Sequence, residues 1–305
     1  MTMGEPSGIG PEVAMAAFHA LGGGIGEHPL KLVGDARVFR HYGVLPDAAN
    51  LPAAPARFFE PGKLDTGNAP SVLAALEEAV RHAQSGAAAA VVTAPIHKAA
   101  LMSAGFSYPG HTEYLAHLTG ARRAVMMLVG ASLRVVPLTI HIPYKDVPPR
   151  VTRNAIIETA RIVLAGLAKD FGIAHPRLAI AGLNPHAGES GELGQEEIYE
   201  IVPAIDMLRG EGHAVFGPMP PDTMFHAEAR AHYDAALCMY HDQALIPLKT
   251  LAFWEGVNVT LGLSIVRTSP DHGTALDIAG QAKADPRSMI AAIKLAAGIA
   301  DARRH

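Results

Sequence analysis

Short apolar runs alternate with longer amphipathic segments along most of this chain. Three segments, at 68–85, 152–171 and 286–303, place their apolar residues with helical spacing. The apolar, β-rich runs have the length and composition of strands. They lie at residues 30–35, 89–95, 124–130, 133–142, 177–185, 235–241 and 256–269. This alternation of strands and helices predicts an α/β layered fold.

Several of the predicted strands are apolar at every position instead of at every second one. Continuous apolar strands are typical of a sheet that helices cover on both faces. The runs 124–130 and 133–140 are joined by only a few residues around Ala131. Because this connection is too short for a crossover helix, the two strands must pair antiparallel. We therefore expect a mixed sheet.

Length and composition narrow the class of protein. The chain has 305 residues, which favours one large α/β unit or two lobes that share a cleft. Hydrophobic residues make up 49%, charged residues make up 18%, and the formal net charge is −4. These values argue against disorder, a nucleic-acid partner and an electrostatic membrane anchor. A small soluble molecule is the expected partner.

Cysteine use and the N-terminal sequence indicate the compartment. Cys238 is the only cysteine, so no internal disulfide or Cys-based zinc site can form. No apolar stretch approaches the roughly 20 residues of a membrane span, and no basic segment precedes an apolar one at the start. We expect a cytoplasmic protein. The chain opens almost directly on MTMGEPSGIGPEV, as though a first strand were cut short, which suggests that a few upstream residues are missing.

Polar residues gather where the predicted strands end. Three of them are histidines: His141 ends one apolar run, His186 follows a second, and His241 follows a third. Open α/β sheets bind ligands in the crevice at the carboxyl ends of their strands. Three neutral imidazoles there could bind one divalent cation and leave positions for substrate and water. A structural hydrogen-bonding role for each histidine is the alternative.

Five further residues have side chains suited to anionic or hydroxyl groups. His111 and Thr112 stand at the start of a helical pattern, where donors and a positive dipole end favour anions, although Thr112 could simply cap the helix. Lys249 and Arg267 can bind phosphate or carboxylate, and Asn258 can bind hydroxyls or amides. Surface salt bridges are the alternative for the two cations.

The opening GEPSGIGPE does not fit a nucleotide-binding motif. The Rossmann fingerprint needs G-x-G-x-x-G between a strand and a helix, but Gly4, Gly8 and Gly10 are spaced differently and Pro11 starts the helix. No Walker A lysine follows. Any nucleotide must therefore be held elsewhere.

Eight motifs taken together resemble the 4-hydroxythreonine-4-phosphate dehydrogenases of pyridoxal phosphate biosynthesis. They occur in order from residue 2 to about residue 300: GEPSGIGPE, TAPIHK, GHTEYLA, GLNPHAGESGELGQEE, PPDTMF, MYHDQALIPLK, GVNVTLGL and RTSPDHGTALDIAGQAKAD. Members of that family are homodimers that use NAD or NADP and a divalent metal such as Zn, Mg or Co, with the active site between two lobes at the subunit interface. The resemblance implies the same for this chain.

The resemblance also implies residue roles. The metal ligands would be His141, His186 and His241, with one ligand set completed across the dimer. Substrate contacts would come from His111, Thr112, Lys249, Asn258 and Arg267. Asp242, Asp222 and Lys249 are the candidates for the general base or for the group that orients it.

A further likeness concerns the isopropylmalate and isocitrate dehydrogenases, whose fold this family is thought to share. SPDHGTALDIAG resembles their adenosine-binding loop, which would place His272, Gly273 and Asp277 near that half of NAD, although Leu276 stands where the relatives have proline. By the same analogy, residues 1–125 and 250–305 would form one lobe, and 126–249 the second lobe with the dimer interface.

The implied reaction oxidises 4-phosphooxy-L-threonine at C3 and decarboxylates the product to 3-amino-2-oxopropyl phosphate. Glu5 and Ser7 stand where many members carry Asp and Ala, which leaves 4-phosphorylated threonate or erythronate, or a dihydrodiol, as alternative substrates. Two functions from other classes also remain. A three-histidine metal hydrolase would bind no NAD, and a metabolite sensor would need neither metal nor NAD.

Overall fold

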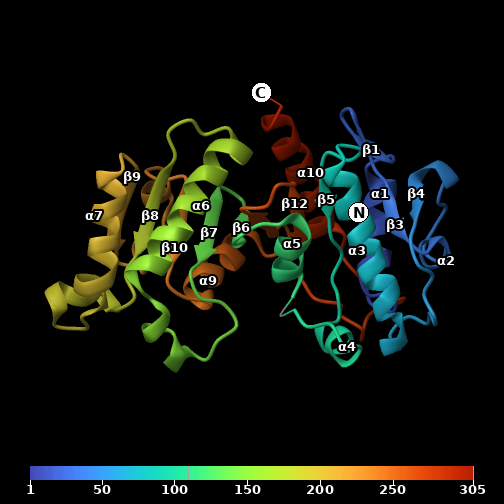
Figure 1. The fold of residues 1–305 in the computed structure, drawn as a ribbon, viewed down its shortest axis with the longest axis horizontal. Coiled ribbons are helices and arrows are strands. Elements are labelled where there is room, and N and C mark those ends of the chain that lie inside the picture. Colours follow the sequence, from blue (N-terminus) through green and yellow to red (C-terminus); the bar gives the residue numbers. More distant parts are fainter. Residues whose placement is uncertain (109, 305) are drawn as a thin grey trace. The chain divides into compact units, whose positions relative to one another are not determined.

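The computed structural model describes residues 1–108 and 110–304, which form two compact units (Figure 1). The first unit comprises residues 1–124 and 257–304, and the second comprises residues 125–256. The sequence placed the changes between lobes at residues 125 and 249. Both units combine helices with strands in parallel and antiparallel pairs, which confirms the predicted α/β class and mixed pairing.

The first unit is built around three neighbouring strands in the order β5 (Val91–Val92), β12 (Arg267–Pro270) and β11 (Val257–Leu261). Strand β12 pairs parallel to β5 and antiparallel to β11. Two smaller sheets accompany them: β1 (Gly24–Ile25) with β2 (His28–Pro29), and β3 (Leu32–Gly34) with β4 (Asn50–Pro52).

Helices of this unit bury one apolar face each. In α3, Val72, Leu76 and Val80 belong to a core cluster that also contains Val91 and Leu115, in keeping with helical spacing of apolar residues. The predicted segments 68–85 and 286–303 are confirmed as α3 and α10. The helices are α1 (Gly10–Ala20), α2 (Ala36–Arg40), α3 (Ala69–Gln84), α4 (Lys98–Ser103), α5 (His111–Thr119) and α10 (Arg287–Ala302).

The run 256–269 corrects one expectation from the sequence. The sequence pattern predicts one continuous apolar strand there, but the run forms two strands, β11 and β12, that pair antiparallel. The chain reverses between them near Gly262, whose φ of +87° lies in the left-handed region that favours glycine. An apolar turn flanked by apolar strands leaves little signal of the reversal in the hydrophobic pattern.

The second unit has five strands in the order β6, β7, β10, β8 and β9 (Figure 1). The pair β6–β7 is antiparallel, as the short connection required, and the remaining pairs are parallel. The strands are β6 (Val125–Gly130), β7 (Leu133–Pro137), β8 (Arg177–Ala181), β9 (Ala214–Met219) and β10 (Ala235–Cys238). Their helices are α6 (Arg153–Phe171), α7 (Val202–Gly210), α8 (Ala227–Arg230) and α9 (His241–Ala252).

Two helices show how the sequence sets element limits in this unit. Helix α6 begins after Thr152, whose hydroxyl accepts a bond from the Ala155 N–H at 3.3 Å, and it ends at Gly172 in the left-handed conformation. Helix α9 packs Ala244 and Leu248 into a buried cluster with Leu128 of β6.

No helix in the described ranges is long and apolar enough to cross a bilayer.

Candidate active site

The opening residues of helix α9 are tied to the strand ends beside them. Tyr240 precedes the helix in an extended conformation and offers no side-chain cap. Gln243 instead links two strands: its Oε1 accepts the Met239 N–H at 2.6 Å, and its Nε2 donates to the Gly182 carbonyl at 2.8 Å. Because Gln243 is buried, these bonds fix where the helix starts relative to β10 and β8.

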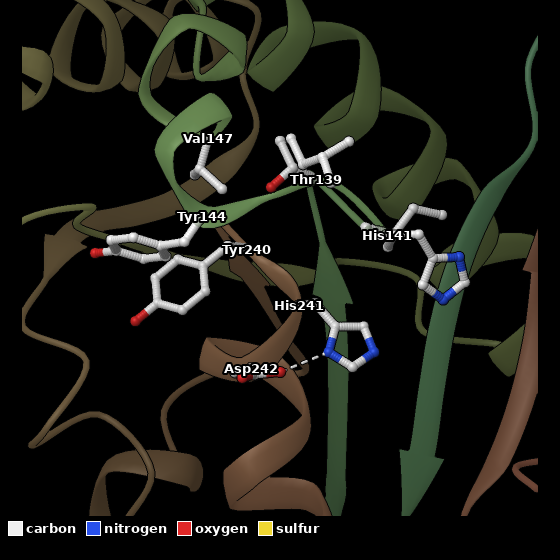
Figure 2. Close-up of a pocket in the computed structure, with 9 residues that line it drawn as sticks. Thr139, His141, Tyr144, Val147, Tyr240, His241 and Asp242 are labelled. Carbon is white, nitrogen blue, oxygen red and sulfur yellow. Dashed lines mark hydrogen bonds and ion pairs between the residues drawn. The ribbon is translucent and has the colours of Figure 1, made fainter.

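His141 and His241 lie beside each other although they come from distant parts of the chain. Beyond the strand ends, the Leu138 N–H donates to the Cys238 carbonyl at 2.8 Å, and the Thr139 hydroxyl donates to the Met239 carbonyl at 2.8 Å. These bonds keep the segments that follow β7 and β10 adjacent beyond the ends of the two strands. The two imidazole centroids are 5.8 Å apart. Figure 2 shows both rings among the residues that line one pocket. His141 has a φ of +24°, a strained backbone conformation of a kind that tends to occur at functional sites.

The two histidines line a pocket of about 260 Å³. Tyr144 and Tyr240 form one part of its lining, with their rings edge to face and centroids 5.4 Å apart. The full lining consists of Thr139, Ile140, His141, Ile142, Tyr144, Val147, Tyr240, His241 and Asp242 (Figure 2). Two imidazoles, a carboxylate and two phenols within a mainly apolar lining are the kind of polar groups that orient a small ligand.

Asp242 sets the orientation of His241. Its carboxylate accepts a bond from His241 Nδ1 at 2.7 Å, and Figure 2 shows the acid on the side of the ring away from His141. A carboxylate partner places the ring hydrogen on Nδ1 and leaves the lone pair on Nε2. This contact favours an orienting role for Asp242.

His186 lies in a turn of unusual backbone geometry, Pro185–Gly191. Five consecutive residues from His186 to Ser190 have positive φ, between 41° and 81°, and four of them are not glycine. Within residues 1–108 and 110–304, no three His, Cys, Asp or Glu side chains are arranged to hold a metal ion. The structure therefore brings together two of the three predicted ligands, His141 and His241, and not the third.

Glu197 supports the turn that carries His186. Its Oε1 accepts the backbone N–H groups of Leu183 and Asn184 at 2.8 Å each, and its Oε2 accepts the Asn184 side-chain N–H at 2.9 Å. The carboxylate is buried, with 3% of the residue exposed. Glu197 is not among the site residues that the sequence predicts. The sequence does carry a signal for it, because Glu197 falls in helical register with the buried Ile201 and Ala204, on a face where an acid is unexpected.

Arg267 is a buried cation held by hydroxyl groups. Its Nε and Nη2 donate to Thr93 Oγ1 at 3.2 and 2.7 Å, and its Nη1 donates to Thr260 Oγ1 at 2.8 Å. In the described part of the chain, no carboxylate pairs with Arg267. Burial lowers the pKa of Arg267 to about 10, so the side chain still carries its charge at neutral pH. Thr93 and Thr260 were not predicted as site residues.

Three other predicted substrate residues, His111, Thr112 and Asn258, lie in the same unit as Arg267. His111 is the first residue of α5, and burial, followed by the charge of Arg267, holds its pKa well below the usual range, so the ring is neutral. Thr112 follows His111 and forms no side-chain cap. Asn258 lies on β11, and its Oδ1 is buried without a hydrogen-bond partner among the described residues. A neutral imidazole and a buried amide oxygen in the same unit as the Arg267 cation are groups that can hydrogen-bond a polar, anionic ligand.

The three candidates for the cofactor loop also lie in the first unit, after β12. His272 Nδ1 bonds to the Gly273 carbonyl at 3.0 Å, while its Nε2 is buried and, among the described residues, without a partner. Asp277 accepts a bond at its backbone carbonyl from Gln281 at 2.6 Å.

The GEPSGIGPE motif contacts this loop. The Ile9 N–H donates to the Thr274 carbonyl at 2.9 Å, and a Cβ at Gly8 would come within 2.8 Å of the same oxygen. The opening motif therefore supports the loop, and Gly8 allows the close approach.

The two remaining base candidates occupy different places in the second unit. Lys249 lies on α9, two turns after His241, with Nζ 5.4 Å from the centroid of the Phe253 ring. Asp222 is exposed in the turn that follows β9. Neither residue is among those that line the His141–His241 pocket.

Comparisons with known proteins identify relatives over nearly the whole chain. The family model described as pyridoxal phosphate biosynthetic protein PdxA matches residues 28–296. A protein of Paracoccus denitrificans named 4-hydroxythreonine-4-phosphate dehydrogenase is 51% identical over 97% of this chain and 95% of its own length. One of the same name from Roseobacter denitrificans is 53% identical over 98% of this chain and 96% of its own.

Solved structures agree in fold. The crystal structure of 4-hydroxythreonine-4-phosphate dehydrogenase from Klebsiella pneumoniae has a TM-score of 0.87 and 38% identity over 98% of both chains. A β-decarboxylating dehydrogenase from Thermococcus kodakarensis has a TM-score of 0.51 at 16% identity, a likeness of fold alone, over 99% of this chain and 82% of its own. From its sequence and its fold, this chain belongs to the PdxA family of pyridoxal phosphate biosynthetic proteins, a family of dehydrogenases.

Proposed function

We propose that this protein oxidises 4-phosphooxy-L-threonine at C3 with NAD or NADP in pyridoxal 5′-phosphate biosynthesis. The hydride leaves C3 for the nicotinamide ring, the C3 hydroxyl loses its proton, and the resulting 3-oxo acid loses CO2 to give 3-amino-2-oxopropyl phosphate. The observation that carries this proposal is the 51% to 53% identity, over almost the whole chain, to enzymes named for that substrate.

The first unit provides groups for the two anionic ends of such a substrate. Arg267 keeps its positive charge because hydroxyls, and no described carboxylate, hold it. His111 is neutral and can donate one N–H, and Asn258 Oδ1 can accept from a hydroxyl or an amino group. We propose that these residues, with Thr112 and Lys249, bind the substrate and fix C3 against the cofactor.

The pocket of the second unit suits a divalent cation. Two imidazoles face one cavity, and the carboxylate of Asp242 leaves Nε2 of His241 with its lone pair available, as in many metal-ligating histidines. We propose that His141, His241 and His186 hold the ion, zinc, magnesium or cobalt, with the ligand set completed in a homodimer. The ion would supply Lewis acidity at the reacting oxygen.

Exposed apolar side chains in the second unit support a homodimer. Phe253 is 60% exposed and Ile246 is 65% exposed, and both belong to α9 or to the residue that follows it. Large exposed apolar groups clustered on one element are typical of protein–protein contacts. We propose that a second copy of this chain covers this face, which light scattering coupled to gel filtration would test.

The proton of the C3 hydroxyl needs an acceptor. Because Asp242 already accepts from His241, we propose that it orients this ring and that the base is Lys249 or Asp222. Lys249→Met and Asp222→Asn distinguish the two, since only the variant that lacks the base loses kcat far more than substrate affinity.

One assay tests the proposed activity. Absorbance at 340 nm is followed with NAD, a divalent metal and 4-phosphooxy-L-threonine, and in parallel with 4-phosphorylated threonate or erythronate. We expect reduction of NAD with the first substrate, and loss of that activity in His241→Ala with an unchanged circular dichroism spectrum. Turnover by metal-stripped enzyme would refute the metal role. Hydrolysis without NAD, or binding without turnover, would instead support a hydrolase or a sensor.

A further inference from the structure

The strand pairing around Arg267 places two threonines on either side of it. In the antiparallel pair β11–β12, Val259 lies opposite Thr268, so the same register sets Thr260 opposite Arg267. In the parallel pair β12–β5, Arg267 lies beside Val91, so Thr93 is two residues further on the same face. Both neighbouring strands thus present a hydroxyl to one guanidinium.

The three bonds hold the guanidinium on two sides. Thr93 accepts from Nε and Nη2, and Thr260 accepts from Nη1, so each nitrogen donates once. A guanidinium has five N–H groups, which leaves one hydrogen on each terminal nitrogen. A pair of N–H groups on two nitrogens matches the oxygens of a phosphate or a carboxylate.

The choice of hydroxyls also decides the charge of the site. Arg267 is 3% exposed, Thr93 is fully buried and Thr260 is 2% exposed. A carboxylate at either threonine position would orient Arg267 equally well, but it would cancel the charge on which anion binding depends. A hydroxyl orients the cation and leaves its charge in place. Each hydroxyl also keeps its own hydrogen, which donates to no protein acceptor among the described residues.

We propose that Thr93 and Thr260 are positioning residues that hold Arg267 for an oxyanion of the substrate without neutralising it. The inference rests on the proposed function, in which Arg267 binds an anionic group of the substrate. It adds that affinity depends on two neutral acceptors on the flanking strands. Both are spaced by strand register and neither would be identified from its residue type alone.

The test compares Thr93→Val and Thr260→Val with a matched control. Thr268→Val is that control, because Thr268 is next to Arg267 on β12, is fully buried, and donates its hydroxyl hydrogen to the Ala292 carbonyl at 2.8 Å on the other face of the strand. Binding of inorganic phosphate is measured by calorimetry, and kcat and KM are measured with 4-phosphooxy-L-threonine. Thermal unfolding of each variant is recorded as a measure of folding.

We expect Thr93→Val to raise the Kd for phosphate and the KM for substrate about ten-fold, the effect of losing hydrogen bonds to a charged group, with kcat little changed. Thr260→Val should have a smaller effect, because it loses one bond instead of two. Thr93→Ser restores a hydroxyl and should bind like the natural protein. Thr93→Asp should fold and bind phosphate poorly, because a carboxylate cancels the charge. Thr268→Val should lower thermal stability and leave both constants unchanged.

Two results would overturn the inference. The first is a Thr93→Val protein that binds phosphate as tightly as the unchanged chain, and the second is a loss of affinity in Thr268→Val as large as in Thr93→Val. Arg267→Lys separates this failure from failure of the proposed function. If Arg267→Lys weakens phosphate binding and Thr93→Val does not, only the positioning role is wrong. If Arg267→Lys has no effect, the anion site itself is wrong. Should Thr93→Val fail to fold, Thr260→Val makes the same test from the other strand.

Discussion

Replacing Glu197 with glutamine should destabilise the turn that carries His186. The carboxylate accepts two backbone N–H groups at 2.8 Å and one amide N–H at 2.9 Å, and it is 3% exposed. A glutamine oxygen can keep the two backbone bonds, but each loses its charge assistance, a cost of about 1 kcal/mol per bond. The new amide group then faces the Asn184 side-chain amide, donor against donor, which costs about 1 to 2 kcal/mol more. The expected loss is therefore about 3 to 4 kcal/mol.

The backbone strain in this turn makes its conformation depend on the contacts that Glu197 provides. Non-glycine residues with positive φ cost on the order of 1 kcal/mol or more each, and His186, Ala187, Glu189 and Ser190 all have such angles. The surrounding contacts must hold them in place, and Glu197 supplies three of these contacts. Without its charge, we expect the turn to open before the rest of the unit unfolds.

Urea unfolding followed by circular dichroism measures the global effect, and hydrogen exchange of residues 182–191 measures local opening. Glu196→Gln is the matched control. Glu196 also accepts a bond from Asn184 Nδ2, at 2.7 Å, but it is more exposed and bonds to neither backbone N–H at the end of β8. We expect less than about 1 kcal/mol of destabilisation for this control. The reasoning is wrong if Glu197→Gln is no less stable than Glu196→Gln and the turn exchanges at its original rate.

Three further predictions can be checked with standard measurements. Gly188→Ala should lower the free energy of unfolding by at least about 1 kcal/mol more than Gly86→Ala does. The two glycines have similar φ, but a Cβ at Gly188 would lie 2.7 Å from Glu197 Oε2, whereas a Cβ at Gly86 meets nothing within 4 Å. Equal losses of stability in urea melts would contradict this prediction. The pKa of His111 is lower in the folded protein than in the unfolded chain, so its contribution to stability should be complete above about pH 6.5 and should be lost as the pH falls below that value. The decrease of unfolding free energy with falling pH should be shallower in His111→Asn. Identical pH dependence of the two proteins in melting experiments would disprove this prediction. The Cys238 thiol is buried and its pKa is raised, so Ellman's reagent should label it only at the rate of unfolding, and rapid labelling of the folded protein would show that the site is open.

The hydrophobic pattern predicted helices and strands well where apolar residues had a clear spacing or a short connection limited the pairing. The long helix 152–171 and the antiparallel pair at 124–140 follow directly from apolar spacing and a short connection. Residues 256–269 were harder, since the reversal at Gly262 interrupts an apolar run by a single residue that also occurs within strands. Local pattern carries no information on which strands become neighbours, so the order of strands needed the structure.

The sequence predicted site residues at positions where a polar or charged side chain is unusual, within an apolar strand or directly after one. Histidines after apolar runs, and a cation within β-rich sequence, stand out by residue type, and the structure places His141 beside His241. Thr93 and Thr260 do not stand out, because threonine is common in strands. Their role depends on the register of three strands, which a single sequence does not encode locally. The ligand role of His186 stays a prediction.

Strand β12 serves two separate purposes through alternate residues. Arg267 faces the threonine hydroxyls, while Thr268, the next residue, is bonded to helix α10 on the opposite face. Substitutions at one position therefore leave the other's environment largely untouched. A mutation that alters the Arg267 side of β12 can therefore leave the packing of α10 intact, so the two faces of this strand can change independently.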